Sequence, residues 1–103
     1  MSRKYSVIAA SRVEAMMIRH ARFLSNVSIP AAKRFRKELA ETIQEIRSNP
    51  YQFSFETDEK LPEHTYRKAL FSMRYKVLFR IDENIVYLDA VCDCRENSPL
   101  GAD

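Results

Sequence analysis

The chain has 103 residues, of which 46% are hydrophobic, and a formal net charge of +3. This length allows one domain with one core and is too short for two domains. The one glycine, Gly101, excludes a glycine-rich phosphate loop and a dinucleotide-binding fingerprint. No apolar run approaches the roughly 20 residues that a membrane-spanning helix needs.

The cysteines and the start of the chain point to a reducing compartment. Cys92 and Cys94 are separated by one residue, so they do not staple the fold, and free thiols suit a reducing environment. The N-terminus starts basic, but its apolar part is much shorter than the roughly 7–15 residues of a secretory signal. We therefore expect a soluble cytoplasmic protein with no membrane partner.

The basic side chains are concentrated in the first half of the chain. Residues 1–47 hold ten Lys or Arg against four Asp or Glu, a net charge of +6, whereas residues 48–103 have a net charge of −3. Such an excess can serve nucleic acid or an acidic protein partner, or it can be the solvated surface of helices.

The first elements are predicted to be a strand and a helix. The alternation in residues 4–11 predicts a short strand that is well covered. Residues 11–26 then predict a helix, in which Ser11 and Glu14 match the capping box. His20 lies along the apolar stripe, so we expect either a packed and satisfied histidine or a contact with a protein partner. The stripe itself comprises Val13, Met16, Met17, Ala21 and Leu24.

Residues 28–50 predict a second, longer helix. Pro30 is tolerated in its first turn, and Asn49-Pro50 ends it. The short link between the helices predicts an antiparallel helical hairpin. The buried stripe of this helix comprises Ala32, Phe35, Leu39, Ile43 and Ile46.

Residues 51–65 are polar and acidic and predict a loop, and residues 66–96 predict three strands with turns near 72–73 and 82–84. The last strand is apolar on both faces except at Asp89, which indicates a central position. The order is therefore β-α-α-β-β-β. We expect an α+β fold with two layers, a helical hairpin packed on an antiparallel sheet. Residues 1–96 form the single domain, and 97–103 are expected to be a flexible tail.

The run "YRKALFSMRYKVLFRIDENIVYLDAVCDCRE" carries a family resemblance. An Arg-bearing strand is followed by "RYKVLFRI", an acidic turn and a Val/Ile-rich strand that ends in Arg. Together with the preceding strand and helical hairpin, this pattern resembles the RelE/ParE superfamily of type II toxin–antitoxin system toxins, over about residues 5–96.

The resemblance implies two different activities. RelE-like members are ribosome-dependent endoribonucleases that cut messenger RNA in the ribosomal A site without metal or other cofactor, and so arrest translation. ParE-like members inhibit DNA gyrase by protein binding and lack the nuclease residues. The favoured interpretation is the RelE-like mRNA interferase; the alternatives are a ParE-like inhibitor and an inactive relative. In each the cognate antitoxin protein is a partner, held in an exposed apolar groove between the hairpin and the sheet edge.

Metal-independent RNA cleavage needs a base, fixed cations that stabilise the phosphorane, and an acid for the leaving oxygen. By resemblance, Arg67, Lys76 and Arg95 match basic positions of the family, and His64 is a candidate acid or base. The nuclease hypothesis requires the three cations to converge on one concave patch. Further candidates for contacts with RNA or a protein partner are Lys68, Arg74, Arg34 and Lys37.

The family pattern is not complete in this chain. Ala69 stands where a second basic strand residue is expected, and the late tyrosine has no counterpart. Some branches of the family use an acidic base, for which Glu56, Glu59 and Glu63 are available. Each of the cations can also be an ordinary solvated residue. No metal is expected, because the two cysteines lack paired ligands at suitable spacing.

Overall fold

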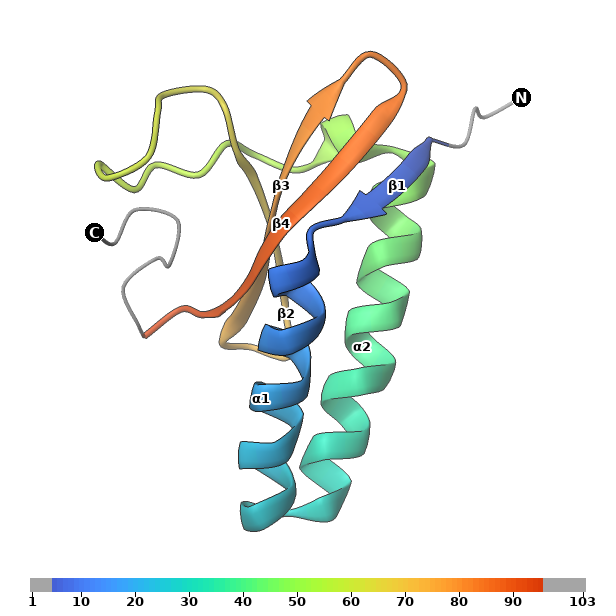
Figure 1. Ribbon diagram of the computed structural model, residues 1–103, viewed down its shortest axis with the longest axis vertical. Helices are drawn as coiled ribbons and strands as arrows, with labels where there is room; N and C mark the ends of the chain where they lie inside the picture. The colour runs from blue at the N-terminus through green and yellow to red at the C-terminus, as the bar shows by residue number, and fades with distance from the viewer. Residues whose placement is uncertain (1–4, 96–103) are drawn as a thin grey trace.

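The computed structural model describes residues 5–95 of the chain. The elements follow the predicted order (Figure 1), which confirms the α+β class. They are β1 (Ser6–Ala9), α1 (Ser11–Val27), α2 (Ile29–Ser48), a single 3₁₀ turn η1 (Pro50–Gln52), β2 (Arg67–Phe71), β3 (Tyr75–Asp82) and β4 (Ile85–Asp93). The predicted flexible tail, 97–103, lies outside the described residues.

The four strands form one sheet in the order β1-β4-β3-β2, so β4 is central as predicted. The sheet is mixed rather than antiparallel, because β1 runs parallel to β4 while the other neighbours are antiparallel. Tight hairpins join β2 to β3 and β3 to β4 and impose antiparallel pairing there. Two helices and two strands separate β1 from β4, so no turn constrains their relative direction.

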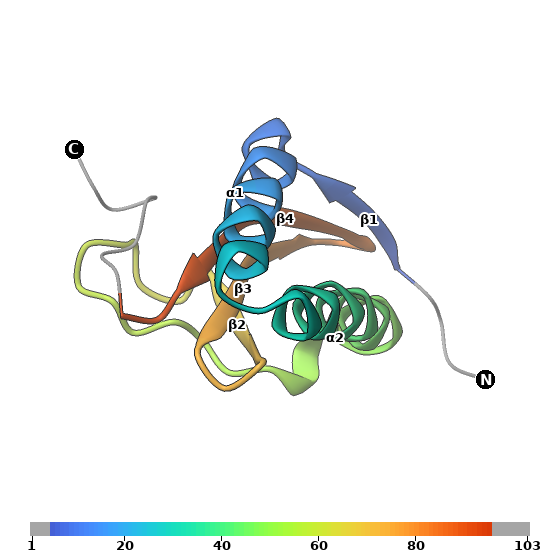
Figure 2. The same cartoon turned by 90° about the horizontal axis from the view of Figure 1, so that it is seen from below.

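The two helices lie side by side against one face of the sheet (Figures 1 and 2). The main core between these layers combines the predicted stripe of α2 with one face of β3. Phe35, Ile46, Val77 and Phe79 are completely buried in it. Burial of such side chains, at about 1.5–3 kcal/mol each, is the main favourable contribution to the two-layer packing.

The starts of the two helices differ. Ser28 caps α2, because its Oγ accepts a hydrogen bond from the Ala31 N–H at 3.3 Å. The capping box predicted for α1 is not formed: Ala10 is the N-cap residue and provides no side-chain hydrogen bond. Its N–H is already bound to the Leu88 carbonyl at 2.9 Å, so the sheet itself holds the extended residue from which α1 begins.

The edge strand β1 is less covered than predicted. Val7 packs against the core, but Ile8 is 48% exposed. The pairing of β1 with β4 ends at Leu88. Helix α1 contacts the next part of β4, where His20 Nε2 lies 3.0 Å from the Val91 carbonyl oxygen. Because a carbonyl only accepts, the ring nitrogen donates. His20 is therefore the packed, satisfied histidine that the sequence predicts.

A second, smaller cluster lies on the other side of β3 and β4. The loop between η1 and β2 crosses this side (Figure 2), and its Leu61 packs with Leu78 and Ala90. The main chain of the loop is also tied to β2, because the Lys68 N–H donates to the Ser54 carbonyl at 3.0 Å. The loop and Met16 of α1 thus cover this side of the sheet together.

Candidate functional site

Arg67 lies on the face of the sheet that the helices cover. Ala69 and Phe71 follow it at every second position of β2, so they share its face, and both are buried in the main core. Its Nη1 donates to the Phe53 carbonyl at 2.6 Å, and its guanidinium lies 4.1 Å from the ring centre of Phe55. These contacts anchor the segment that follows α2.

Lys76 lies on the opposite face. It pairs in register with Leu70, while Lys68 pairs with Leu78. The Lys76 ammonium forms an ion pair with Glu56, and the two side chains are only 15% and 6% exposed. The Glu56 carboxylate also accepts hydrogen bonds from the N–H groups of its own loop, at 2.8 Å and 3.1 Å.

The ion pair determines the charge of both partners. Burial alone would raise the pKa of the Glu56 carboxyl, but the hydrogen bond and charge of Lys76 outweigh it and lower that pKa. Burial likewise opposes the charge of Lys76, and Glu56 outweighs it and raises the pKa of the ammonium. Both groups are therefore ionised at neutral pH.

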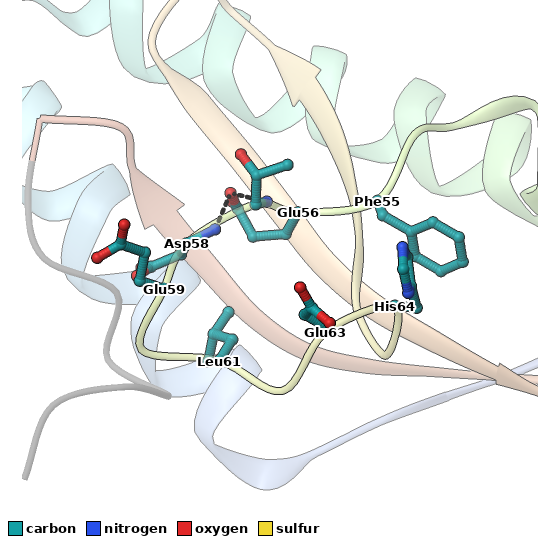
Figure 3. Close-up of a pocket in the computed structure, with 8 residues that line it drawn as sticks. Phe55, Glu56, Asp58, Glu59, Leu61, Glu63 and His64 are labelled. Carbon is teal, nitrogen blue, oxygen red and sulfur yellow. Dashed lines mark hydrogen bonds between the residues drawn. The ribbon is translucent and has the colours of Figure 1, made fainter.

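His64 lines an open pocket of about 550 Å³ in the loop (Figure 3). Its ring packs edge-on against Phe55, with ring centres 5.2 Å apart, and its backbone has φ 53°. The other lining residues include four acids, Glu56, Asp58, Glu59 and Glu63. No Lys or Arg is among the residues that line this pocket, so nothing there would hold a phosphate group beside His64.

Arg95 is held at the end of β4 by Asp93. The buried Asp93 carboxylate accepts hydrogen bonds from Arg95 Nε at 3.1 Å and Arg95 Nη2 at 2.8 Å, and Arg74 Nε lies 3.9 Å away. The hydrogen bonds from Arg95, followed by its charge and that of Arg74, lower the pKa of Asp93 to about 2 despite burial. Asp93 thus stays charged and orients two guanidinium groups.

These guanidinium groups border a surface depression that we call the arginine hollow. It consists of two adjoining depressions of about 590 and 430 Å³ that share Phe23, Tyr75 and Arg95. The end of the helical hairpin forms one wall, and the turn between β2 and β3 forms the other. The expected groove between hairpin and sheet is present at this place. Its charged lining residues are Arg19, Arg34, Arg74, Asp93 and Arg95.

The structure thus distributes the predicted site residues over several places. Arg34, Arg74 and Arg95 meet in the arginine hollow, whereas Lys68 and Lys76 lie under the acidic loop and Arg67 on the helix-covered face. Arg67, Lys76 and Arg95 are not gathered in one patch. Lys37 is exposed on α2 and lies outside the arginine hollow.

Sequence reasoning missed Asp93 and Phe23, and it considered Arg19 only as one cation of the basic first half of the chain. The spacing in "DCR" was a usable signal for Asp93, because residues two apart at the end of a strand share a side. Arg19 and Phe23, four residues apart on α1, also present one side of a helix. Their position beside the end of β4 depends on tertiary packing, which the local pattern does not contain.

No protein-family model matches the chain, and no curated protein matches it either. Among residues 5–95, no helix is both long and apolar enough to cross a membrane. Within the same residues, no three His, Cys, Asp or Glu side chains gather as metal ligands would. The function of this chain is therefore inferred from the family resemblance and from the geometry of the arginine hollow.

Proposed function

We propose that this protein is the toxin component of a type II toxin–antitoxin module, and that it acts as a ParE-like inhibitor that binds its target. The observation that carries this proposal is the arginine hollow, where Arg34, Arg74 and Arg95 surround exposed apolar side chains. Such a surface suits an interface with another protein. The family resemblance supplies the target class, DNA gyrase, and the antitoxin as second partner.

The separation of the expected catalytic cations supports binding over cutting. A phosphorane needs several cations directed at one group. Arg67 and Lys76 are directed to opposite faces of the sheet, and Arg95 is engaged with Asp93 beyond the end of β4. Arg67 and Lys76 thus fasten one loop to the sheet from its two faces, and Arg95 is held separately at the end of β4.

The proposal can be tested by expressing the protein from an inducible promoter in bacteria without its antitoxin. Growth and the 5′ ends of abundant messenger RNAs, mapped by primer extension, are followed together. We expect growth arrest without new RNA ends. New ends at the ribosomal A site would contradict the binding mechanism, and undisturbed growth at a verified level of folded protein would contradict the toxin assignment.

A RelE-like ribonuclease is the second candidate function, because one observation favours it. Glu56 is a buried carboxylate that stays ionised beside Lys76, with Lys68 on the same face. A carboxylate base and two lysines are elements that such chemistry uses. If RNA ends appear on induction, the Glu56→Gln variant tests this site. Loss of cleavage with retained folding would support it, and unchanged cleavage would exclude Glu56 as the base.

A further inference from the structure

The partner that the arginine hollow is built to bind can be described by its chemistry. We infer that it is an acidic peptide segment of another protein. This segment carries a large apolar side chain that is flanked by carboxylates and enters the hollow. This inference rests on the proposed binding function and specifies the surface that performs it.

The apolar component consists of side chains that the fold leaves uncovered. Phe23 is 57% and Val27 72% exposed at the end of α1, and Met73 in the facing turn is fully exposed. Leu24 and Tyr75 lie buried beneath them and form the floor of the hollow. Three exposed large apolar side chains from two elements, facing one depression, are typical of a protein-binding site.

The charged component is strongly positive. Four arginines line the hollow against one acid, Asp93, and that acid is already paired with Arg95 and Arg74. No ion pair of Arg19 or Arg34 is found with any other residue between 5 and 95. A partner that brings carboxylates complements this excess, and guanidinium groups bind carboxylates in a bidentate way.

The same observations disfavour two other occupants. In a symmetric dimer, a second copy of this chain would bring the same four arginines to the contact, and like charges repel. Single-stranded RNA would satisfy the arginines, but it also requires exposed rings on which bases stack. Of the rings in the hollow only Phe23 is exposed, and Val27 and Met73 are aliphatic. An acidic peptide with an apolar anchor uses both components.

The inference is tested by fluorescence anisotropy with the purified full chain and three labelled heptapeptides. Each peptide is Asp-Glu-Glu-X-X-Glu-Asp, where X-X is Leu-Phe, Ile-Leu or Trp-Val. We expect at least one to bind about tenfold or more tighter than its Ser-Ser analogue, its Lys/Arg-flanked analogue and a ten-residue oligouridylate. Binding should weaken with salt, because the attraction is electrostatic at an exposed site.

Matched variants locate the binding site. Arg34→Glu and Phe23→Ala should each lower the affinity for the peptide about tenfold, because each removes an exposed side chain that forms part of the hollow. Lys37→Glu makes the same charge change on the same helix but lies outside the hollow, so it should leave affinity within about twofold.

Four outcomes would overturn the inference. These are binding of none of the peptides, tighter binding of the oligouridylate, equal losses for Arg34→Glu and Lys37→Glu, or a solution dimer that Arg34→Glu dissociates. The proposed function can fail separately, because peptide binding with normal cell growth would leave this inference intact while contradicting a toxin.

Discussion

Arg67 and Lys76 point to opposite faces of the sheet, yet they hold the two ends of one four-residue segment. Arg67 binds the carbonyl of Phe53, and Lys76 binds the carboxylate of Glu56. The segment between them bridges to β2 through Phe55. The two cations that resemble catalytic residues therefore fasten the loop to the sheet from both sides, which explains their presence without any phosphate.

Replacing Arg67 by Ala should lower stability and leave target binding unchanged. The substitution removes a hydrogen bond to Phe53 and the cation–π contact with Phe55. A loss of about 1–3 kcal/mol in the free energy of unfolding is expected. Urea denaturation at pH 7 measures it, with Arg12→Ala on the exposed side of α1 as a control that should change little. Equal stability of Arg67→Ala and wild type would contradict a structural role.

The buried pair of Glu56 and Lys76 should behave as a coupled unit. Lys76→Met leaves the Glu56 carboxylate buried without its partner, and we expect it to cost about 3 kcal/mol. The double variant Glu56→Gln with Lys76→Met should recover much of that loss, since no uncompensated charge remains. A double-mutant cycle by urea denaturation gives the coupling free energy. Purely additive losses would show that the two groups do not interact in solution.

Asp93 should make the protein less stable in acid. Its pKa in the folded state, about 2, is below the ordinary value of 3.8, so the unfolded chain takes up the proton first. The stabilisation is therefore complete above about pH 4 and is lost as the pH falls toward 2. We expect about 1–2 kcal/mol, because solvent screens Arg95, whose side chain is 63% exposed.

The matched variant for this pH dependence is Asp93→Asn. Unfolding free energies of both proteins are compared at pH 7, 4 and 3, so that the other carboxylates, Glu56 among them, cancel in the difference. The advantage of wild type at pH 7 should shrink as the pH falls from 4 to 3. A difference that stays constant with pH would mean that the ionised form of Asp93 is not what stabilises the fold.

The sequence predicts the elements of this fold better than their connections in space. Alternating residues identify the strands, and the apolar stripe through Phe35 and Leu39 identifies α2. The direction of β1 is not encoded in its alternation, which reads the same for parallel and antiparallel pairing. The prediction of a capping box was wrong for a similar reason. The Ala10 N–H donates a hydrogen bond to the Leu88 carbonyl of a distant strand, and this contact determines where α1 begins.

The site was predicted only in part, because a resemblance between linear patterns does not show which face a side chain occupies. Arg67 shares a face with Ala69 and Phe71, and the register across the turn then places Lys76 on the other side. Arg34, Arg74 and Arg95 are distant in sequence, and only the packing of the helical hairpin brings them to one hollow.

Charge reversal in the hollow should relieve growth arrest. Arg34 lines the hollow and Lys37 does not, although both are exposed cations of α2. We expect Arg34→Glu to restore colony formation on induction by at least about tenfold relative to wild type, and Lys37→Glu to remain toxic. Colony counts measure the effect, and immunoblots verify equal protein levels. Equal toxicity of the two variants would exclude the hollow as the surface that acts on the target.

The most direct test of the central claim is a supercoiling assay with DNA gyrase, relaxed plasmid and the purified protein. We predict inhibition of supercoiling that increases with protein concentration, is relieved by Arg34→Glu and is retained by Lys37→Glu. Undiminished supercoiling at saturating protein, without DNA breakage, would contradict the claim that this chain is a ParE-like inhibitor acting by binding.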